Sequence, residues 1–597
     1  MKTKAIISLF LCLLLLWGCG SATVGSDPTE GSKPPIGTLF PSQSGIADVD
    51  TLFTDRDLSG TYDKEKAVRI HFEEGAVSAG NGVTVTGTSA AITKEGTYIV
   101  TGSCSDGVLA VYVPKDAKVQ LVLEGVTLCS KTGAAIHVIQ ADKVFVTLAP
   151  GSQNVLSNGG SFENDGESNV DAVIFSKEDL TINGSGSLRV TSPAGHGIVS
   201  KDELTMAGGS IAVTSASHGV SGKDNVCITA TQLQIASGKD GIHGDNPEDA
   251  ALGFVYIKDG NITIDAQGDG ISASSILQID GGVFDITTGG GSENGKDHTS
   301  DGWGGMPGGN MPGGRPGGRA ASQTDTEDSS SIKGLKATAA LLVNGGVFTM
   351  DCADDAIHSN GNITVTAGTL TIESGDDGFH ADETLHISGG TIVIAEGYEG
   401  LEGLDILVSG GDISITSSDD GINAAGGTDE SGFGGNRGDG FGGGFGGMMG
   451  GGASNGSITI SAGKVFIFAG GDGIDANGSL LISGGEVVIH GPTTGDTSVL
   501  DFDSSGIITG GTFIGTGGKM MAQTFTSSEN QGVISVSVGS NVAAGTQILL
   551  RDSSGNVVLD ITPNQNFAIV ILSCPEIVKG ETYTITVGTA SGEFEAK

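Results

Sequence analysis

The chain has 597 residues, 103 of them glycine, and its 70 acidic and 29 basic residues give a formal net charge of −41. Proline is scarce and no Gly-X-Y period appears, which excludes collagen, and recurrent alternating runs of Val, Ile and Leu argue against simple disorder. Such a charge repels nucleic acid and anionic lipid, so we expect neither as a partner, whereas it attracts divalent cations.

The first residues have the pattern of an export signal. Lys2 and Lys4 precede an apolar run from Ala5 to Leu16, and small residues follow it. The run is too short to span a membrane comfortably. We therefore predict a signal peptide over residues 1–19.

The end of this signal, LWGC, resembles a bacterial lipobox, which implies a lipid on Cys19. Trp17 replaces the small residue usual at its position, so an ordinary secretory signal cut nearby is the alternative. A Ser/Gly/Pro-rich tether is predicted over residues 20–49. The expected location is the extracellular face of the bacterial cell membrane, held only by this lipid anchor, or the medium if Cys19 carries no lipid.

The body of the chain repeats an eight-residue motif about every 22 residues. Two copies, SASHGVSG (Ser215–Gly222) and SGKDGIHG (Ser237–Gly244), begin 22 positions apart. Glycine-rich insertions at about 289–329 and 426–453 interrupt the period. Between motifs, two alternating runs flank a Gly-Gly pair, as in LHISGGTIVI, so each repeat predicts three short strands and three turns.

These features predict an all-β protein in which residues 50–518 form a right-handed parallel β-helix of about 22 residues per coil. No repeat can bury its own inner face, so the coils must stack, at about 4.8 Å, and the hand follows the usual crossover chirality. A calcium-binding nonapeptide roll is excluded because its nine-residue period is absent. Residues 519–597 lose the repeat and predict a small β-sandwich-like cap over the last strand edges.

Stacking would align equivalent motif positions into rows. The fifth position is almost always glycine, which predicts a turn with positive φ, and the apolar sixth position is expected to point inward. The fourth position gives His196, His218, Asp240, Asp269, Lys333, Asp355, Asp377, Glu399, Asp420 and Asp472. The third position adds Asp354, Asp376 and Asp419, and the seventh adds His243, Lys336, His358, His380, Glu402, Asn423 and Asp475.

Rows of carboxylates favour binding of a hard cation. Two carboxylates about 5 Å apart repel by roughly 3 kcal/mol at an effective dielectric near 20, so they raise one another's pKa or bind an ion. Calcium accepts such oxygen ligands with flexible geometry, which makes Asp240, Asp269 and Asp472 candidate ligands. The alternative is that Asp-Gly is ordinary turn chemistry, repeated because the turn is repeated. Zinc is disfavoured because the histidines lie on separate coils without close pairing and no cysteine shares the face.

The stretch from Ser329 to Gly427, with SIKGLKA, LLVNGGVFTMDCADDAIHS and ESGDDGFHADETLHISGG, resembles the bacterial carbohydrate-binding parallel β-helix family. The family occurs on anaerobes that degrade plant cell walls and is related in fold to pectate lyases. The resemblance implies calcium-dependent binding of polygalacturonate, and of cellulose, without cleavage. Its calcium-binding carboxylates would be Asp354, Asp355, Asp376, Asp377, Glu399, Asp419 and Asp420.

Two other functions fit the same pattern. A calcium-dependent polysaccharide lyase would need a basic side chain as its general base, and Lys239, Lys333 and Lys336 lie on or beside the acidic rows. Charge compensation among carboxylates is the alternative role for these lysines. A structural adhesin that calcium merely stiffens is the other possibility. We expect a monomer, and Tyr398 and Trp303 are the aromatic residues to watch for sugar stacking.

Overall fold

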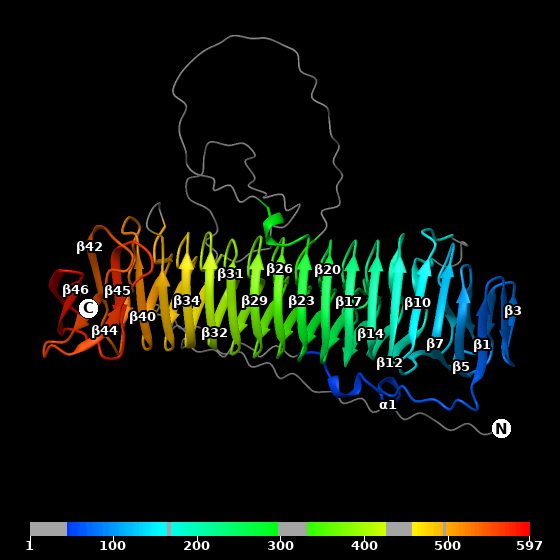
Figure 1. Ribbon diagram of the computed structural model, residues 1–597. Helices are drawn as coiled ribbons and strands as arrows, with labels where there is room; N and C mark the ends of the chain where they lie inside the picture. The colour runs from blue at the N-terminus through cyan, green and yellow to red at the C-terminus, as the bar shows by residue number, and fades with distance from the viewer. Residues whose placement is uncertain (1–44, 164–168, 297–330, 426–455, 493–496) are drawn as a thin grey trace, which may run out of the picture. The chain divides into compact units, whose positions relative to one another are not determined.

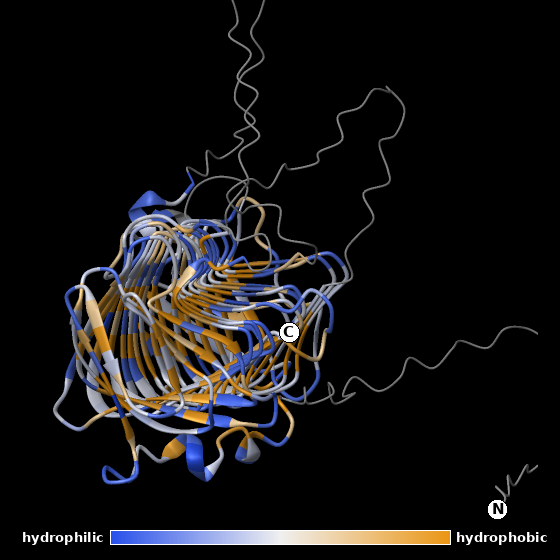
Figure 2. Ribbon diagram, turned by 90° about the vertical axis from the view of Figure 1, so that its right-hand side faces the viewer, coloured by the Kyte–Doolittle hydropathy of each residue, from blue (hydrophilic) through white to orange (hydrophobic). Residues whose placement is uncertain are grey.

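The computed structural model describes residues 45–163, 169–296, 331–425, 456–492 and 497–597, which belong to one compact unit. The predicted signal with Cys19, most of the predicted tether, Trp303 and most of both glycine-rich insertions lie outside these residues. The described chain is all-β, with parallel strands in a closed, barrel-like sheet and almost no helix (Figures 1 and 2). None of the described helices has the length and apolar character that crossing a membrane requires.

Strands one repeat apart pair in parallel and in register. Ile242 lies opposite Ile271, which in turn lies opposite Leu335 on the far side of the first insertion. The pairings form three ladders, here called A, B and C. The repeat inferred from the sequence is therefore also the repeat of hydrogen bonding.

Ladder A carries the motif. Its strands are β4 (Ser89–Ile92), β6 (Val108–Tyr112), β8 (Ile136–Gln140), β11 (Ala172–Ser176), β13 (His196–Ser200), β15 (Val220–Gly222), β18 (Ile242–Gly244), β21 (Ile271–Ala273), β24 (Leu335–Ala337), β27 (Ile357–Ser359), β30 (Phe379–Ile387), β32 (Leu401–Ser417), β33 (Ile422–Ala424), β35 (Ile474–Ala476) and β38 (Leu500–Phe502). Strands β30 and β32 continue from ladder A into ladder B, and β32 reaches ladder C.

Ladders B and C complete each repeat. Ladder B also contains β5 (Gly96–Cys104), β7 (Lys118–Ser130), β9 (Lys143–Leu148), β12 (Asp179–Ser192), β14 (Glu203–Ser215), β16 (Asn225–Thr229), β19 (Phe254–Ile257), β22 (Ile276–Ile279), β25 (Ala340–Val343), β28 (Asn362–Val365), β34 (Ser457–Ala469), β36 (Ser479–Ile482), β39 (Ser505–Ile508) and β41 (Ser527–Ser528). Ladder C adds β10 (Gln153–Asn158), β17 (Thr231–Ser237), β20 (Gly260–Ala266), β23 (Val283–Thr288), β26 (Val347–Cys352), β29 (Thr369–Ser374), β31 (Thr391–Glu396), β37 (Glu486–His490) and β40 (Thr512–Gly517). The long strands β5, β7, β12, β14 and β34 take part in both ladders.

Alternating side chains fill the interior. In β20 the buried Ile262 and Ile264 alternate with outward-facing polar residues, and the same pattern recurs in the next strands of ladder C. Stacked repeats place like on like, so the rings of Phe284 and Phe348 lie parallel with their centroids 4.5 Å apart. Each buried side chain of this size contributes about 1.5–3 kcal/mol. These side chains belong to one hydrophobic cluster with members from Ile70 to Ile571, so the core is continuous along the sheet, and Figure 2 shows the apolar segments of successive strands in line.

The glycines serve two different geometries. The second residue of the Gly-Gly turns has positive φ, as at Gly346 (106°) and Gly390 (96°). The fifth-position glycines of the motif do not, so the predicted positive φ there is wrong. A Cβ on Gly241 would lie 2.6 Å from Ile264 Cγ2 and 2.7 Å from the carbonyl oxygen of Gly270. Glycine is present at this position because two repeats and the core approach closely.

The N-terminal end begins with two short helices, η1 (Val49–Thr51) and α1 (Asp55–Leu58), that pack on the sheet from outside. The strands that follow, β1 (Val68–Glu73), β2 (Ala76–Ala79) and β3 (Val83–Thr86), belong to the sheet: β1 pairs in parallel with β5, whereas β2 pairs with β1 and β3 with β4 in antiparallel fashion. Asp57 of α1 is buried. It accepts a hydrogen bond from the Thr181 hydroxyl (2.6 Å) and forms an ion pair with Lys143 (3.0 Å). Ile46 donates its N–H to Gln278 Oε1 (2.8 Å), so the packed segment begins before residue 50.

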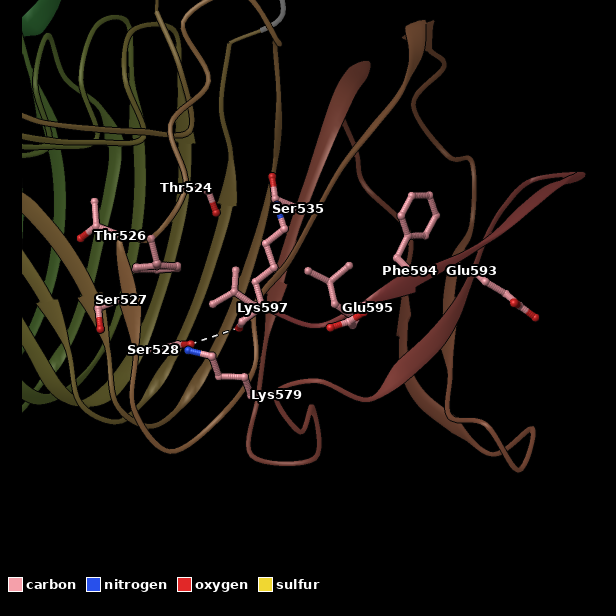
Figure 3. Close-up of a pocket in the computed structure, with 13 residues that line it drawn as sticks. Thr524, Thr526, Ser527, Ser528, Ser535, Lys579, Glu593, Phe594, Glu595 and Lys597 are labelled. Carbon is pink, nitrogen blue, oxygen red and sulfur yellow. Dashed lines mark hydrogen bonds between the residues drawn. The ribbon is translucent and has the colours of Figure 1, made fainter.

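At the C-terminal end the pairing changes from parallel to antiparallel. Strand β40 pairs with β45 (Phe567–Ser573), which also pairs with β42 (Ile534–Val542). A separate antiparallel sheet contains β43 (Ile548–Arg551), β44 (Val557–Ile561), β46 (Thr582–Val587) and β47 (Ala590–Glu595). It shares a second hydrophobic core with β40, β42 and β45. A hollow lies between β41 and β47, where Ser528 donates to the carbonyl oxygen of Lys597 (Figure 3).

Candidate functional site

The motif turns stack into a continuous row of side chains along ladder A. In each repeat the fifth residue donates its N–H to the carbonyl of the fourth residue in the next repeat, as from Gly219 to Asp240 (2.9 Å) and from Gly421 to Asp472 (2.9 Å). The sixth residue, such as Ile242, is fully buried and fixes the turn from inside. We call the aligned fourth- and seventh-position side chains the motif row.

The seventh position is aligned by strand pairing in the same way. Its members, in order, are Val199, Ser221, His243, Ser272, Lys336, His358, His380, Glu402, Asn423, Asp475 and Asp501. The row is therefore two residues wide, and its chemistry changes along its length from imidazole through ammonium to carboxylate.

Each fourth-position aspartate divides its two oxygens between two tasks. Asp240 Oδ1 accepts the N–H of Asp269 (2.9 Å), which belongs to the next repeat. Asp355 Oδ1 accepts the N–H of Asp377 (3.1 Å) in the same way. This is the turn chemistry that offers a structural explanation for the aspartates, but it occupies one oxygen only. The second oxygen faces the other side chains of the row.

At its N-terminal end the row contains stacked histidines. The rings of His196 and His218 have centroids 5.0 Å apart, and those of His218 and His243 are 4.3 Å apart. The prediction that the histidines would lack close pairing is therefore wrong, because the seventh position of one repeat reaches the fourth position of the repeat before it. Burial lowers the pKa of His196 to about 3.

Asp240 joins two of these rings. Its Oδ2 lies 3.3 Å from His218 Nδ1 and 2.6 Å from His243 Nδ1. Burial raises the pKa of Asp240, but its contacts with the two imidazoles outweigh burial, and the net shift is downward. We call His218, Asp240 and His243 the histidine triad.

In the middle of the row, buried lysines and carboxylates pair. Lys333 Nζ lies 2.6 Å from Asp355 Oδ2 and 3.3 Å from Asp354 Oδ1, with all three residues buried. Burial raises the pKa of Asp355, but Lys333 and a nearby imidazole lower it by more than burial raises it, so the net shift is downward. Lys336 Nζ lies 3.6 Å from Asp269 Oδ2. These two lysines are placed as the counter-charges of neighbouring aspartates, whereas Lys239 is exposed.

The next repeats mix imidazole and carboxylate. His380 Nδ1 lies 3.3 Å from Asp377 Oδ2 and also contacts Glu402 Oε2. Burial lowers the pKa of His380, but its carboxylate partners, Asp377, Asp382 and Glu402, raise it well above the ordinary value. Asp376 joins Asp354 and Asp355 in a second, fully buried group of oxygens. Glu399 is held by the Asn423 amide (2.9 Å).

At its C-terminal end the ionisable side chains of the row are all carboxylates, and among the described residues no opposing charge pairs with them. Burial and neighbouring carboxylates raise the pKa of Asp420 to about 8, of Asp472 to about 7 and of Asp475 to about 6. One oxygen of each lies within 4.8 Å of the others. We call Asp420, Asp472 and Asp475 the carboxylate triad. Asp419 lies beside it, where Gly471 leaves room for its side chain.

Sequence reasoning placed the candidate residues in rows but chose incompletely among them. Asp475 and Glu402 were not among the predicted ligands, although both belong to metal-sized groups. Their seventh-position spacing was the signal that could have identified them. Of the predicted ligands, Asp269 pairs with a lysine rather than with other carboxylates. Tyr398 lines a hollow beside the row with Glu396 and Lys296.

Comparison with known proteins identifies relatives. A family model described as "Carbohydrate-binding domain-containing protein" matches residues 86–378 and 376–547. A relative from Acetivibrio thermocellus with the same description is 40% identical over 236 residues, which are 39% of this chain and 82% of that protein. A solved structure described as the polysaccharide lyase-like protein from C. thermocellum, gadolinium derivative, is 33% identical and covers 38% of this chain and 92% of its own, with a TM-score of 0.37.

Proposed function

We propose, from the premise that the chain belongs to the family of carbohydrate-binding domain-containing proteins, that it binds an acidic plant cell-wall polysaccharide through calcium. Polygalacturonate is the proposed ligand and cellulose a further one. The observation that carries the proposal is the carboxylate triad, in which three carboxylates converge on the motif row without an opposing charge among the described residues. We also infer that the three parallel ladders are the faces of a right-handed parallel β-helix, the usual hand of parallel crossovers.

The donor set of the triad fits calcium. Calcium takes six to eight oxygen ligands in flexible geometry, and Asp420, Asp472 and Asp475 offer carboxylate oxygens within 4.8 Å of one another. Turn carbonyls and water would complete the shell. Glu399, which precedes the triad in the row, and Asp419, which lies beside the row, are the further predicted ligands there. Asp354, Asp355 and Asp376 form a second oxygen group, in which Lys333 already supplies a positive charge.

Calcium would also reverse the unfavourable charge between the two partners. A chain with a net charge of −41 repels a polyuronate, whose own carboxylates repeat along the polymer. A bound ion can be coordinated by oxygens of the protein and of the polymer at the same time, and it is then the largest local charge at the contact. The row would thus offer the polymer a line of positive sites, with the hollow at Tyr398 beside it for one sugar ring.

Binding without cleavage agrees better with the lysines than lyase chemistry does. A general base must be able to lose its proton and reach the substrate. Lys333 is buried between Asp354 and Asp355, and Lys336 is drawn to Asp269. Lys239 is exposed but stands next to the histidine triad rather than the carboxylate triad. For the location, we propose attachment to the extracellular face of the membrane through Cys19.

The test is retention of the purified, tag-free chain on insoluble polygalacturonate, in calcium or in chelator, with ultraviolet absorbance read on the same samples. We expect retention in calcium only and no rise in absorbance. Asp475→Asn should need at least about tenfold more calcium for half retention, because it removes one ligand of the triad. Asp412→Asn is the matched control: it removes an exposed carboxylate of β32 that lies in ladder C, outside the motif row.

The other outcomes reject parts of the proposal. Rising absorbance from unsaturated product would make the protein a lyase and direct attention to Lys239. Retention that is equal in chelator would exclude calcium as the bridge. Calcium-dependent stability without retention on any glycan would leave a structural rod.

A further inference from the structure

We propose that the histidine triad is a second metal site, which takes a zinc-class ion rather than calcium. The three residues come from two adjacent repeats. His218 and Asp240 are fourth-position residues in successive turns, and His243 is the seventh-position residue of the second turn. One ligand atom of each residue lies within 4.8 Å of the others, and Asp240 Oδ2 is close to the Nδ1 atoms of both His218 and His243. This inference is independent of the glycan ligand proposed above.

The hydrogen bonding of the triad leaves these three atoms facing one another. Asp240 Oδ1 is used by the N–H of Asp269, so Oδ2 is the oxygen that faces the imidazoles. The Nδ1 atoms of His218 and His243 are buried, and although they lie close to Oδ2 neither is aligned for a hydrogen bond. Buried polar atoms in proteins are normally paired, and two buried imidazole nitrogens that converge on one carboxylate oxygen without aligned hydrogen bonds suit a shared ion.

The spacing fits a tetrahedral ion. Zinc binds histidine nitrogen and carboxylate oxygen at about 2.0–2.2 Å, so two of its ligands are about 3.3 Å apart. Asp240 Oδ2 and His218 Nδ1 already have that separation, at 3.3 Å, and the 2.6 Å between Asp240 Oδ2 and His243 Nδ1 would open by a small ring movement. Calcium prefers oxygen ligands alone, and the triad supplies only one carboxylate.

The triad is accessible yet held firmly. The side chains of His218, Asp240 and His243 are 16%, 13% and 24% exposed, so solvent reaches one side and a fourth ligand can be water or a polymer oxygen. The ring of His196 packs against the outer face of His218 and limits its rotation. The fully buried Val220 and Ile242 anchor the strands that follow the fourth-position residues.

A similar group farther along the row already contains a positive charge, the ammonium of Lys333. Asp355, His358 and His380 also bring one carboxylate and two imidazoles together. Lys333 Nζ lies 2.6 Å from Asp355 Oδ2, where an ion would bind, and the whole group is buried. In contrast, Asp240 forms its ion pairs with the two histidines, and no lysine ammonium is paired with it among the described residues. The histidine triad is therefore the site of this kind that is open to an ion.

The test is calorimetric titration of the tag-free chain with Zn2+ in the presence of excess Ca2+. We expect one Zn2+ ion per chain that calcium does not displace. His218→Ala and His243→Ala should each weaken binding by at least about tenfold, while His386→Ala, which removes a half-buried histidine outside the row, should not. Asp475→Asn should leave Zn2+ binding unchanged even if it abolishes calcium-dependent retention, so failure of this inference and failure of the proposed function are distinguishable.

A second measurement needs no variant. When the chain is loaded with one equivalent of Cu2+, its electron paramagnetic resonance spectrum should show coupling of the copper to two imidazole nitrogens. Coupling to oxygen alone, or Zn2+ binding that calcium fully displaces, would overturn the proposal. Equal Zn2+ affinity of the His218→Ala, His243→Ala and unaltered proteins would do the same.

Discussion

The histidine triad and the carboxylate triad occupy the same three register positions at two ends of one row. In each, a fourth-position residue meets the fourth- and seventh-position residues of the following repeat. The corresponding pairs are His218 and Asp420, Asp240 and Asp472, His243 and Asp475. The backbone hydrogen bond between the two turns is 2.9 Å in both. The fold thus fixes where the ligands stand, and two side chains out of three decide which ion they suit.

The largest expected difference between the ends is their response to pH. Asp420, Asp472 and Asp475 have pKa values raised to about 8, 7 and 6, chiefly by burial and then by one another. Their pKa values in the folded protein exceed the value near 3.8 in the unfolded chain. The folded state therefore has its full stability below about pH 3.8 and loses free energy of unfolding as the pH rises through 6 to 8. One pKa unit corresponds to about 1.4 kcal/mol. After reduction for solvent exposure and shared repulsion, we expect the metal-free protein to lose about 5 kcal/mol between pH 5 and pH 8.

Denaturant unfolding in chelator at several pH values measures this loss. Calcium should flatten the pH dependence, because a bound ion favours the ionised carboxylates. Asp475→Asn should also flatten it, whereas His243→Gln at the other end should not. Equal stability of the metal-free protein at pH 5 and pH 8 would contradict the prediction.

The boundary between the two ends should be the most sensitive single position. Lys333→Met would leave Asp355 buried without its ammonium partner, and breaking a buried ion pair costs about 3–5 kcal/mol. Lys336→Met is the control: its ammonium is half-buried and 3.6 Å from Asp269, so we expect less than about 1 kcal/mol. The measurement is the free energy of unfolding in chelator. A loss no larger than that of the control would mean that Lys333 is not needed as a counter-charge.

Exchanging the side chains should exchange the ions. Asp420→His with Asp475→His gives the carboxylate end the ligand set of the histidine triad. We expect its preference for Zn2+ over Ca2+ to rise about 100-fold, which is about 2.8 kcal/mol, because imidazole suits zinc and not calcium. Titration of each ion against the double variant and the parent measures this ratio. An unchanged ratio would show that the backbone, rather than the side chains, selects the ion.

The sequence predicted the rows because a period of 22 residues places equivalent positions in register, even across an insertion. Asp269 and Lys333 are neighbours although 64 positions separate them. The sequence could not predict which side chains of a row contact one another. Which oxygen of Asp240 faces the histidines depends on the N–H of Asp269 taking the other one. The stacking of His218 on His243 joins a fourth to a seventh position, and a comparison of like positions does not reveal such a pair.

The fifth-position glycine shows the same limit in the backbone. A glycine that recurs at one position of a repeated turn motif suggests positive φ, and the Gly-Gly turns do have positive φ. At Gly241 the reason is space, because a neighbouring repeat and a core side chain leave no room for a Cβ. Sequence gives the two causes the same letter, and only the packing between repeats separates them.

The smallest expected effect tests whether the two ends share one backbone. A Cβ at Gly241 would lie 2.7 Å from the carbonyl oxygen of Gly270, and one at Gly421 would lie 2.6 Å from that of Gly473. Overpacking of this kind costs about 1–3 kcal/mol, so we expect Gly241→Ala and Gly421→Ala each to lower the free energy of unfolding by about 2 kcal/mol. Ala356 occupies the same motif position in another repeat, so a methyl group is strained there rather than forbidden.

Equal costs at the two glycines, measured in chelator at about pH 5, would show that the ends differ in side-chain chemistry alone. At that pH the carboxylate triad is largely protonated, because its pKa values are raised to between about 6 and 8, so repulsion contributes little to either measurement. A cost at Gly421 that exceeds the cost at Gly241 by more than about 1 kcal/mol would mean that the carboxylate end is also packed more tightly. The choice of ion would then depend on backbone spacing as well as on the ligands.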